Sequence, residues 1–256
     1  MKKPVYYVIL ALLVGVFLFA AYKVGSYYLE KYRSDKVISE ANRFVTLPGD
    51  SDNNDPTQDP SGDPECPTVQ FDELLKTNGD VIAWIYGANT HINYPVVQGS
   101  DNDYYLRHLL DGTWNDNGSI FMDCANSADF SDQNSLIYGH NMHDGSMFGQ
   151  LVRYRDEDFY KAHPTFTFDT LYEGGTWQVV AAVDTALGAD TLPYYTFFDA
   201  DTKLDWQHRV RAITEKALYD TGVMPEYGAQ LLTLSTCGDT HPDTDARFAL
   251  LAVRID

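Results

Sequence analysis

The chain has 256 residues, enough for one or two domains with a hydrophobic core. Its formal net charge of −19 argues against nucleic acid as a partner, because a basic face supplies the affinity for phosphates. Aromatic residues make up 14% of the chain, and this composition favours a β-rich fold over a helical one.

An apolar run near the N-terminus is long enough to cross a bilayer. Val5 to Tyr22 carries no charge, and a spanning helix needs about 20 such residues. Lys2 and Lys3 precede the run, as expected for a cytoplasmic N-terminus, although basic residues also follow it. A cleaved signal peptide is the alternative, but no small-residue cleavage site follows the run. We therefore expect residues 1–25 to be an uncleaved membrane anchor, with the rest of the chain outside the cytoplasm.

Residues 26–66 are expected to form a stalk and a linker. Residues 23–46 have a helical composition. The segment from Gly49 to Glu65 then contains six acidic residues, three prolines, no basic residue and no large apolar residue. Such a segment cannot bury enough surface to become ordered, so we predict a flexible acidic tether. The folded domain is expected to span residues 67–256, beginning with a short helix that Thr68 caps and Gly79 ends.

Eight short apolar runs, separated by Gly, Asn and Asp, follow this helix. They are VIAWIYG, INYPVVQ, GSIFMD, NSLIYGH, TFTFDTLY, TWQVVAAVDT, QLLTLSTC and RFALLAVRI. This pattern predicts a mainly β fold, a closed or nearly closed barrel. Two helices are expected to interrupt the barrel, one around Met147–Tyr154 and one at Asp201–Tyr219. In the second, Trp206, Val210 and Ile213 recur at helical spacing.

Three side chains at strand ends could form a catalytic group. Cys237 ends one apolar run and His140 ends another, so the two can meet at one rim of a barrel. A thiol becomes an effective nucleophile when an imidazole takes its proton, and the imidazole can later protonate a leaving amine. Arg247 opens the last strand ten residues after Cys237. Its permanent charge could stabilise an oxyanion.

Each of these residues also has a structural interpretation. Cys237 could be a buried core thiol, and Arg247 could pair with an acid of the preceding loop, at Asp239, Asp243 or Asp245. His143 competes with His140 but follows the strand on a turn, where we expect it to be solvated. The sequence has no Cys or His pair at metal-ligand spacing and no glycine-rich phosphate loop, so we expect no cofactor.

Several motifs resemble those of the class B sortases. The sequence TLSTC, followed ten residues later by Arg247, resembles the sortase signature of TLxTC with a downstream arginine. The segments NSLIYGHNMHDGSMFGQL and NTHINYPVVQGSDNDYYLRH resemble the class B form of the family. The resemblance covers about Phe71 to Asp256, and the helix before the cysteine strand also fits it.

This resemblance implies a membrane-anchored cysteine transpeptidase of a Gram-positive bacterium. The implied fold is an eight-stranded barrel with an N-terminal helix and an inserted helix before the cysteine strand. Such enzymes cut a sorting motif, here expected to be of the Asn/Ser-Pro-x-Thr-x type, after its threonine. They hold the threonine as a thioester and pass it to a peptidoglycan precursor amine. The implied partners are therefore secreted surface proteins with a sorting signal, the wall amine and the membrane.

The resemblance also implies roles for individual residues. Cys237 would be the nucleophile, His140 the acid and base, and Arg247 the oxyanion stabiliser. Ser235 and Thr236 would line the substrate groove. Two alternative functions stay open: another cysteine acyl-transferase that acts on wall peptides, although the S-H-G-C arrangement is missing, and a non-catalytic tethered binding domain with Cys237 buried. A Cys66–Cys124 disulfide is also possible in an oxidising compartment.

Overall fold

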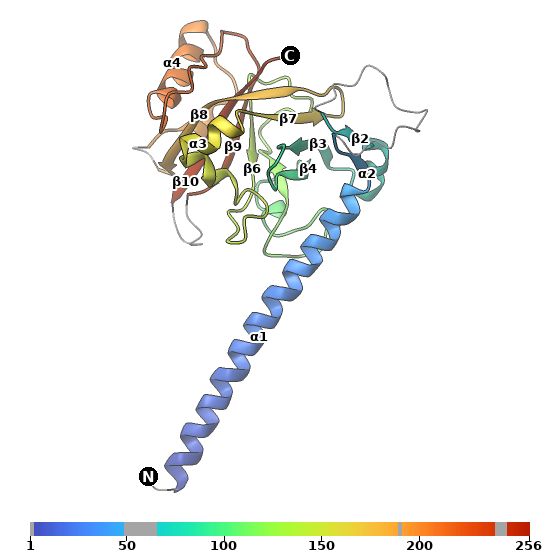
Figure 1. The fold of residues 1–256 in the computed structure, drawn as a ribbon, viewed down its shortest axis with the longest axis vertical. Helices are drawn as coiled ribbons and strands as arrows, with labels where there is room; N and C mark the ends of the chain where they lie inside the picture. Colours follow the sequence, from blue (N-terminus) through green and yellow to red (C-terminus); the bar gives the residue numbers. More distant parts are fainter. Residues whose placement is uncertain (1–2, 49–65, 189–190, 239–244) are drawn as a thin grey trace.

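Figure 1 shows the computed structural model, in which a β-barrel carries a long projecting N-terminal helix. The structure describes residues 3–48, 66–188, 191–238 and 245–256. The predicted acidic tether, from Gly49 to Glu65, lies outside the described residues. So do Asp239 and Asp243, two of the acids considered as partners of Arg247.

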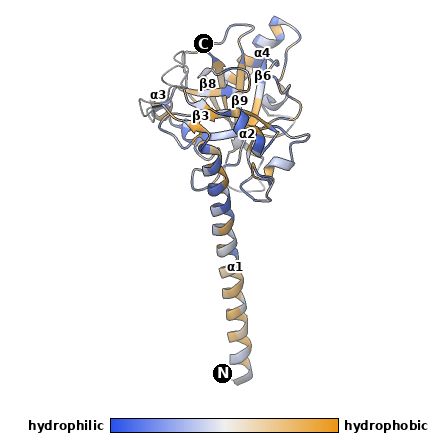
Figure 2. Ribbon diagram, turned by 90° about the vertical axis from the view of Figure 1, so that its right-hand side faces the viewer, coloured by the Kyte–Doolittle hydropathy of each residue, from blue (hydrophilic) through white to orange (hydrophobic). Residues whose placement is uncertain are grey.

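Helix α1 (Lys3–Asn42) is continuous over 40 residues and carries both the predicted anchor and the predicted stalk. It is long and apolar enough to cross a membrane, and the protein buries none of its apolar window. Figure 2 shows that the hydrophobic part lies far from the barrel and that the helix becomes more hydrophilic as it approaches the barrel. There, Ser34 and Ala41 are buried, and Asn42 Oδ1 accepts a hydrogen bond from Asn93 Nδ2 at 3.0 Å. The stalk residues are therefore packed against the barrel.

Short elements join α1 to the barrel. Strand β1 (Val45–Thr46) pairs antiparallel with β2 (Thr68–Val69), which brings together the two ends of the linker. Helix α2 (Phe71–Thr77) follows, as predicted. Its N-cap residue is Gln70, however, and Thr68, the expected cap, lies in β2 instead.

The barrel is closed and contains all eight strands predicted from the apolar runs. The strands are β3 (Val81–Tyr86), β4 (Asn93–Val97), β5 (Ile120–Met122), β6 (Asn134–Tyr138), β7 (Thr165–Thr170), β8 (Thr176–Ala186), β9 (Leu231–Cys237) and β10 (Ala246–Arg254). Their order around the barrel is β10-β8-β7-β3-β4-β5-β6-β9. The pairs β4–β5 and β6–β9 are parallel and the other neighbours are antiparallel. Closure pairs every edge, which protects the sheet from pairing with other chains.

Alternation along the strands separates two apolar clusters. Leu232 and Leu234 of β9 pack with Phe248 of β10 in the largest cluster. Leu231 lies on the opposite face of β9 and packs in a second cluster with Trp206. Because side chains of a strand point alternately to its two faces, the odd-numbered residues of β9 all share the face of this second cluster.

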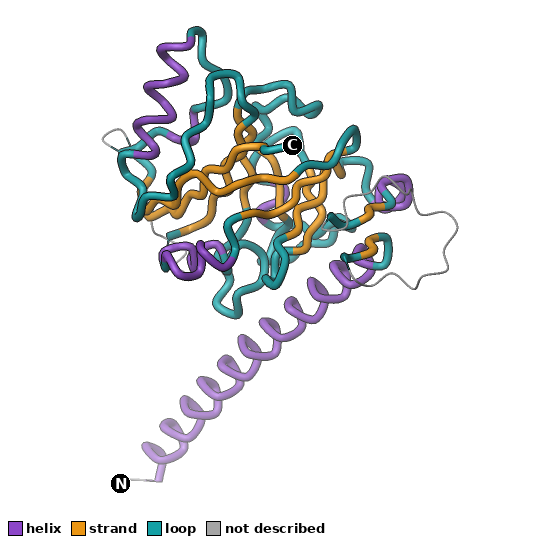
Figure 3. Tube along the Cα trace, turned by 45° about the horizontal axis from the view of Figure 1, so that its top comes forward, coloured by secondary structure: helices purple, strands orange, loops and turns teal. Residues whose placement is uncertain are grey.

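The inserted helices differ in part from the prediction. Around Met147–Tyr154 the chain forms the 3₁₀ helix η2 (Leu151–Arg155) and then helix α3 (Glu157–Ala162), so the helical part begins later than expected. Helix α4 (Lys203–Thr214) confirms the second insertion, although it ends before Tyr219. Two further 3₁₀ turns, η1 (Tyr104–Leu106) and η3 (Tyr194–Thr196), lie in the β4–β5 and β8–β9 connections. Figure 3 shows helical segments (purple) around the strands (orange) of the barrel.

Replacing Trp206 tests how α4 is attached. Trp206 is 2% exposed in the second cluster, so Trp206→Ala should lower the free energy of unfolding by roughly 3–5 kcal/mol. Chemical denaturation of the purified chain measures the change. Leu204 lies on the same helix and is 61% exposed, so Leu204→Ala should change the value by only about 0.5 kcal/mol. Equal losses in the two variants would contradict this packing.

Asp169 is a buried carboxyl that costs the fold stability at neutral pH. It is 7% exposed, and its Oδ1 has no hydrogen-bond partner among the described residues. Burial raises the pKa of Asp169 to about 6, and the charge of Asp256 acts in the same direction. The folded chain therefore keeps this proton at pH values where the unfolded chain, with a pKa of about 3.9, has lost it. The contribution of Asp169 to stability is therefore most favourable below about pH 4, and it falls as the pH rises through about 6.

The variant Asp169→Asn removes this titration. At pH 7.5 its free energy of unfolding should exceed that of the parent chain by up to about 3 kcal/mol, from a pKa shift of about two units. Near pH 4 the difference should vanish. Denaturation curves at several pH values measure it, with the exposed Asp201→Asn as a control. A difference that does not depend on pH would rule out the proposed linkage.

Candidate active site

The residues predicted to be catalytic line one pocket at the C-terminal ends of β6 and β9. The two strands are parallel, with Tyr138 opposite Ser235, so both end at the same rim. Cys237 is the last residue of β9, and His140 follows β6 by two residues. The pocket has a volume of about 350 Å³, and both residues line it. The structure thus brings together side chains that are almost 100 positions apart in the sequence.

Cys237 and Arg247 lie directly opposite each other in the antiparallel β9–β10 ladder. Opposed residues point to the same face, with Cβ atoms about 4.5–5.5 Å apart. Both side chains are half-buried and line the pocket. Arg247 Nη1 also donates a hydrogen bond to the carbonyl oxygen of Ala246 at 2.8 Å. A permanent positive charge therefore lies beside the thiol, in the position expected from the sequence.

His140 is oriented by a backbone carbonyl. Its Nε2 lies 2.8 Å from the carbonyl oxygen of Leu106. Because a carbonyl oxygen can only accept, Nε2 carries a hydrogen in this contact, and Nδ1 is the nitrogen that can take up a proton. His143 is exposed, as predicted, and lines a different pocket from His140.

Two side chains hold the backbone at the end of β9. Asn141 Nδ2 donates to the carbonyl oxygen of Cys237 at 2.9 Å, and Arg155 Nη2 donates to that of Gly238 at 2.6 Å. Arg155 also forms an ion pair with Asp184 of β8 at 2.7 Å. The sequence analysis singled out neither residue. Asn141 directly follows His140 and could have been found from that motif, but Arg155 lies 83 residues from Gly238 and gives no local signal.

Ser235 and Thr236 both line the pocket but make different contacts. The Ser235 and Tyr194 hydroxyl oxygens lie 2.7 Å apart in a buried hydrogen bond. Burial raises the pKa of Tyr194, although its hydrogen bond with Ser235 and the charge of Arg247 oppose the change, so this side chain remains a neutral phenol. Thr236 Oγ1 donates to the carbonyl oxygen of Gly139 at 2.8 Å. The Thr236 hydroxyl therefore joins β9 to the segment that carries His140.

The remaining walls of the pocket are largely aromatic and aliphatic. They are formed by Asn102, Leu106, Phe121, Asp123, Tyr138, Gly139, Leu187, Tyr194 and Tyr195. A concave, mainly apolar surface with a few polar groups is typical of a site that binds a ligand. Gly139 allows the chain to pass close to Phe148, because a Cβ at this position would lie 2.8 Å from the Phe148 ring.

The cysteines can now be distinguished by their surroundings. Cys124 is an exposed free thiol, so the Cys66–Cys124 disulfide that the sequence left open is not formed in the structure. Cys237 is a partly exposed free thiol at the pocket. This exposure disagrees with the alternative in which Cys237 is a buried core residue.

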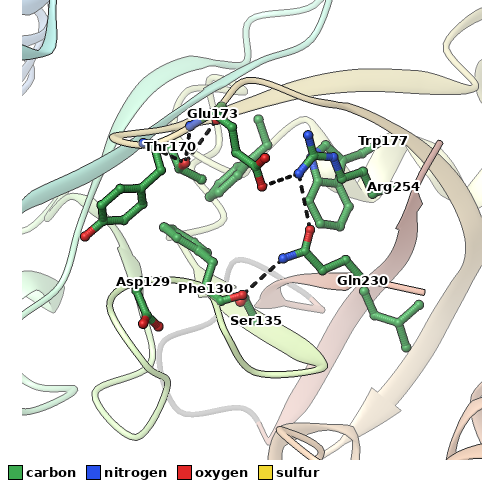
Figure 4. A pocket seen from close by; sticks show the side chains of 11 residues that line it. Asp129, Phe130, Ser135, Thr170, Glu173, Trp177, Gln230 and Arg254 are labelled. Atoms are coloured by element: carbon green, nitrogen blue, oxygen red, sulfur yellow. Dashed lines mark hydrogen bonds and ion pairs between the residues drawn. The ribbon is translucent and has the colours of Figure 1, made fainter. Parts of the chain in front are cut away.

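A second cavity lies at the opposite end of the barrel, where β6 and β9 begin (Figure 4). Its volume is about 130 Å³, and Ser135, Phe130 and Trp177 are among its lining residues. Arg254, at the end of β10, forms an ion pair with Glu173 beside it. None of the predicted catalytic residues lines this cavity. Among the described residues, no group of three or more His, Cys, Asp or Glu side chains could hold a metal ion.

Comparisons with known proteins identify close structural and sequence relatives. The chain is 33% identical to sortase B of Listeria monocytogenes over 230 residues, which cover 90% of this chain and 87% of that protein. It is also 33% identical to sortase B of Staphylococcus aureus over 183 residues, covering 72% of this chain and 73% of that protein. No family model matches the sequence.

Solved structures give the same result. A structure of sortase B from B. anthracis in complex with AAEK1 has a TM-score of 0.72 and 30% identity, covering 90% of this chain and 99% of that chain. A Staphylococcus aureus sortase B–substrate complex has a TM-score of 0.68 and 32% identity, covering 73% of this chain and 85% of that chain. The chain therefore shares its overall fold with these solved sortase B structures.

Proposed function

Since the chain belongs to the sortase B family, a family of cysteine transpeptidases, we propose that it cleaves a sorting motif of the Asn/Ser-Pro-x-Thr-x type after the threonine. It then transfers the threonine to an amine of a peptidoglycan precursor. The clients are secreted surface proteins of a Gram-positive bacterium. The observation that carries this proposal is that Cys237, His140 and Arg247 line one pocket, with the thiol and the guanidinium on opposed strand positions.

The first step forms a thioester on Cys237. Nδ1 of His140 takes the thiol proton, and the sulfur attacks the carbonyl carbon of the substrate threonine. The S–C bond forms as the carbonyl oxygen becomes negative. The amide C–N bond then breaks, and His140 returns the proton to the leaving amine. Its contact with Leu106 keeps Nε2 occupied, so the proton moves through Nδ1.

Arg247 stabilises the oxyanion of this step. Its charge is permanent, and its position opposite Cys237 directs it toward the carbonyl that the sulfur attacks. Asn141 and Arg155 hold the carbonyl oxygens of Cys237 and Gly238, so the thiol keeps its position while its charge changes. These two are positioning residues, since each acts through the backbone.

The second step releases the product to the wall. The precursor amine attacks the thioester carbonyl while His140 takes its proton, a new amide bond forms, and the Cys237 thiolate leaves and is reprotonated. The aromatic wall of the pocket suits a proline-containing peptide, because extended proline segments pack well on aromatic side chains. Ser235 and Thr236 line the same groove.

We further propose that the chain is a single-pass protein of the cell membrane. Residues 1–25 would anchor it, 26–66 would form the stalk and linker, and 67–256 would form the catalytic domain outside the cytoplasm. The apolar, uncovered N-terminal half of α1 supports this arrangement. A client that is itself held at the membrane would then meet the enzyme at a raised effective concentration.

Replacing the nucleophile tests the proposed chemistry. The full chain, purified in detergent, is incubated with Asn-Pro-x-Thr-type peptides, with and without a short amine acceptor. Mass spectrometry should detect cleavage after threonine, a thioester on Cys237, and a new amide when the acceptor is present. Cys237→Ala should abolish all three products. Cys124→Ala removes an exposed thiol outside the pocket and should keep them.

Two results would argue against this function. Full cleavage by Cys237→Ala would exclude Cys237 as the nucleophile. Absence of any peptide adduct while Cys237 reacts readily with alkylating reagents would move the assignment to a cysteine acyl-transferase that acts on wall peptides.

Replacing Arg247 tests the oxyanion role. Arg247→Ala should lower the rate of thioester formation by about 10²–10³-fold, the usual cost of losing one oxyanion donor. Single-turnover mass spectrometry with saturating peptide measures the rate. Arg209→Ala is a matched control, because Arg209 pairs with Asp205 on the surface of α4 at 3.0 Å. A loss below about tenfold for Arg247→Ala, with the fold intact, would contradict this role.

A further inference from the structure

An exposed group of aromatic rings lies on the segment between β4 and β5. Trp114 is 58% exposed, while the other three tryptophans of the chain are buried. The His108 ring contacts Trp114 edge-on, with 5.3 Å between centroids, and stacks on Tyr104 at 3.9 Å. Tyr104 is also exposed. We call Tyr104, His108 and Trp114 the aromatic ledge.

The segment that carries the aromatic ledge contacts α1 at one point along the helix, at Glu30. Asn115, which follows Trp114, is fully buried, and its Nδ2 donates to the carbonyl oxygen of Glu30 at 2.8 Å. Lys31, the next residue of α1, forms an ion pair with Asp144, which lies on the loop after His140. The ledge and the loop after His140 therefore both meet α1 at Glu30 and Lys31.

This level lies close to the end of the apolar run of α1. Glu30 is eight positions after Tyr22, and a rise of 1.5 Å per residue places it about 12 Å farther along the helix. The headgroup layer on each side of a bilayer adds roughly 5–8 Å to the hydrocarbon core, which leaves about 4–7 Å between this layer and Glu30, a gap that one tryptophan side chain can span. The intervening turns expose Tyr27 and Tyr28, and Tyr32 is exposed just beyond them. Tyrosine and tryptophan are the residues that concentrate at membrane interfaces.

We infer that the aromatic ledge and these tyrosines of α1 form one contact surface for the outer headgroup layer of the bilayer. This inference rests on the proposed membrane anchoring. Continuity with the uncovered apolar helix favours lipid as the occupant. Charge does not drive the contact, because Arg107 pairs with Asp116, Lys31 pairs with Asp144, and the chain is strongly acidic. The contact should therefore be insensitive to salt.

If this surface contacts the bilayer, the rim that carries Cys237 and His140 opens toward the membrane. Leu106, whose carbonyl oxygen holds His140, lies in η1 together with Tyr104. Strand β10 runs from Arg247 at this rim to Arg254 near the C-terminus, and Figure 1 shows α1 projecting away from the C-terminus. The rim with Cys237 and His140 therefore faces the membrane, and the second cavity faces away from it. A sorting signal that emerges from the bilayer meets the groove directly.

Tryptophan fluorescence tests this contact with the full chain. The protein is reconstituted into vesicles of phosphatidylcholine and phosphatidylglycerol whose acyl chains carry bromine, a quencher, either near the headgroup or near the chain end. Bromine near the headgroup should quench the emission more strongly than bromine near the chain end. Trp114→Phe should remove this quenching, because the other tryptophans are buried in the barrel. Trp114→Phe should keep cleavage of soluble peptides, because Trp114 does not line the pocket.

The possible failures can be told apart. If the chain floats with the vesicles but bromine quenches no emission, the barrel stands clear of the membrane and the inference is wrong, while the anchoring stands. If the chain does not float with the vesicles, the anchoring is wrong and the inference falls with it. Quenching that persists in Trp114→Phe, or that disappears at high salt, would also overturn the inference.

Discussion

The parallel pairing of β6 with β9 is the constraint on which the proposed active site depends. Parallel neighbours end at the same rim, so the segment after β6 delivers His140 to the place where β9 ends in Cys237. The antiparallel register with β10 then puts Arg247 opposite the thiol. A slip of one residue in β9 would turn Cys237 toward the cluster that holds Leu232 and Leu234, because side chains alternate between the two faces of a strand. Barrel closure fixes this register from both sides of β9.

Much of this arrangement could be predicted from the sequence, and the reasons are local. The eight strands were found from short apolar runs with turn residues between them, and His140, Cys237 and Arg247 from their places at strand ends. The helix expected around Met147–Tyr154 begins only at Leu151, as a 3₁₀ helix, because Met147 and Phe148 are buried in the core by a loop. Thr68 was misassigned as a cap because the pairing of β2 with β1 involves a partner on the other side of the linker.

Contacts between segments that lie far apart in the sequence could not be predicted from the sequence. Helix α1 packs against the barrel through Ser34 and Ala41, two small buried residues that let the helix come close. Serine and alanine are common at exposed helix positions too, so the sequence does not predict this contact. Arg155 contacts Gly238, which lies 83 residues later in the sequence. Both contacts depend on the three-dimensional path of the chain. The burial of Ser34 and Ala41 makes α1 a structural part of the enzyme, so the long helix and the barrel that carries the proposed site are one unit.

We propose that the groove presents a threonine carbonyl to Cys237 and Arg247 together. A crystal structure with a peptide analogue, joined by a disulfide bond to Cys237 in place of the threonine, would test it most directly. The account predicts that the peptide lies along Tyr194 and Ser235, with its carbonyl oxygen about 2.7–3.1 Å from the Arg247 guanidinium. A peptide bound outside the groove would contradict this proposal. So would an Arg247 side chain that points away from the carbonyl oxygen.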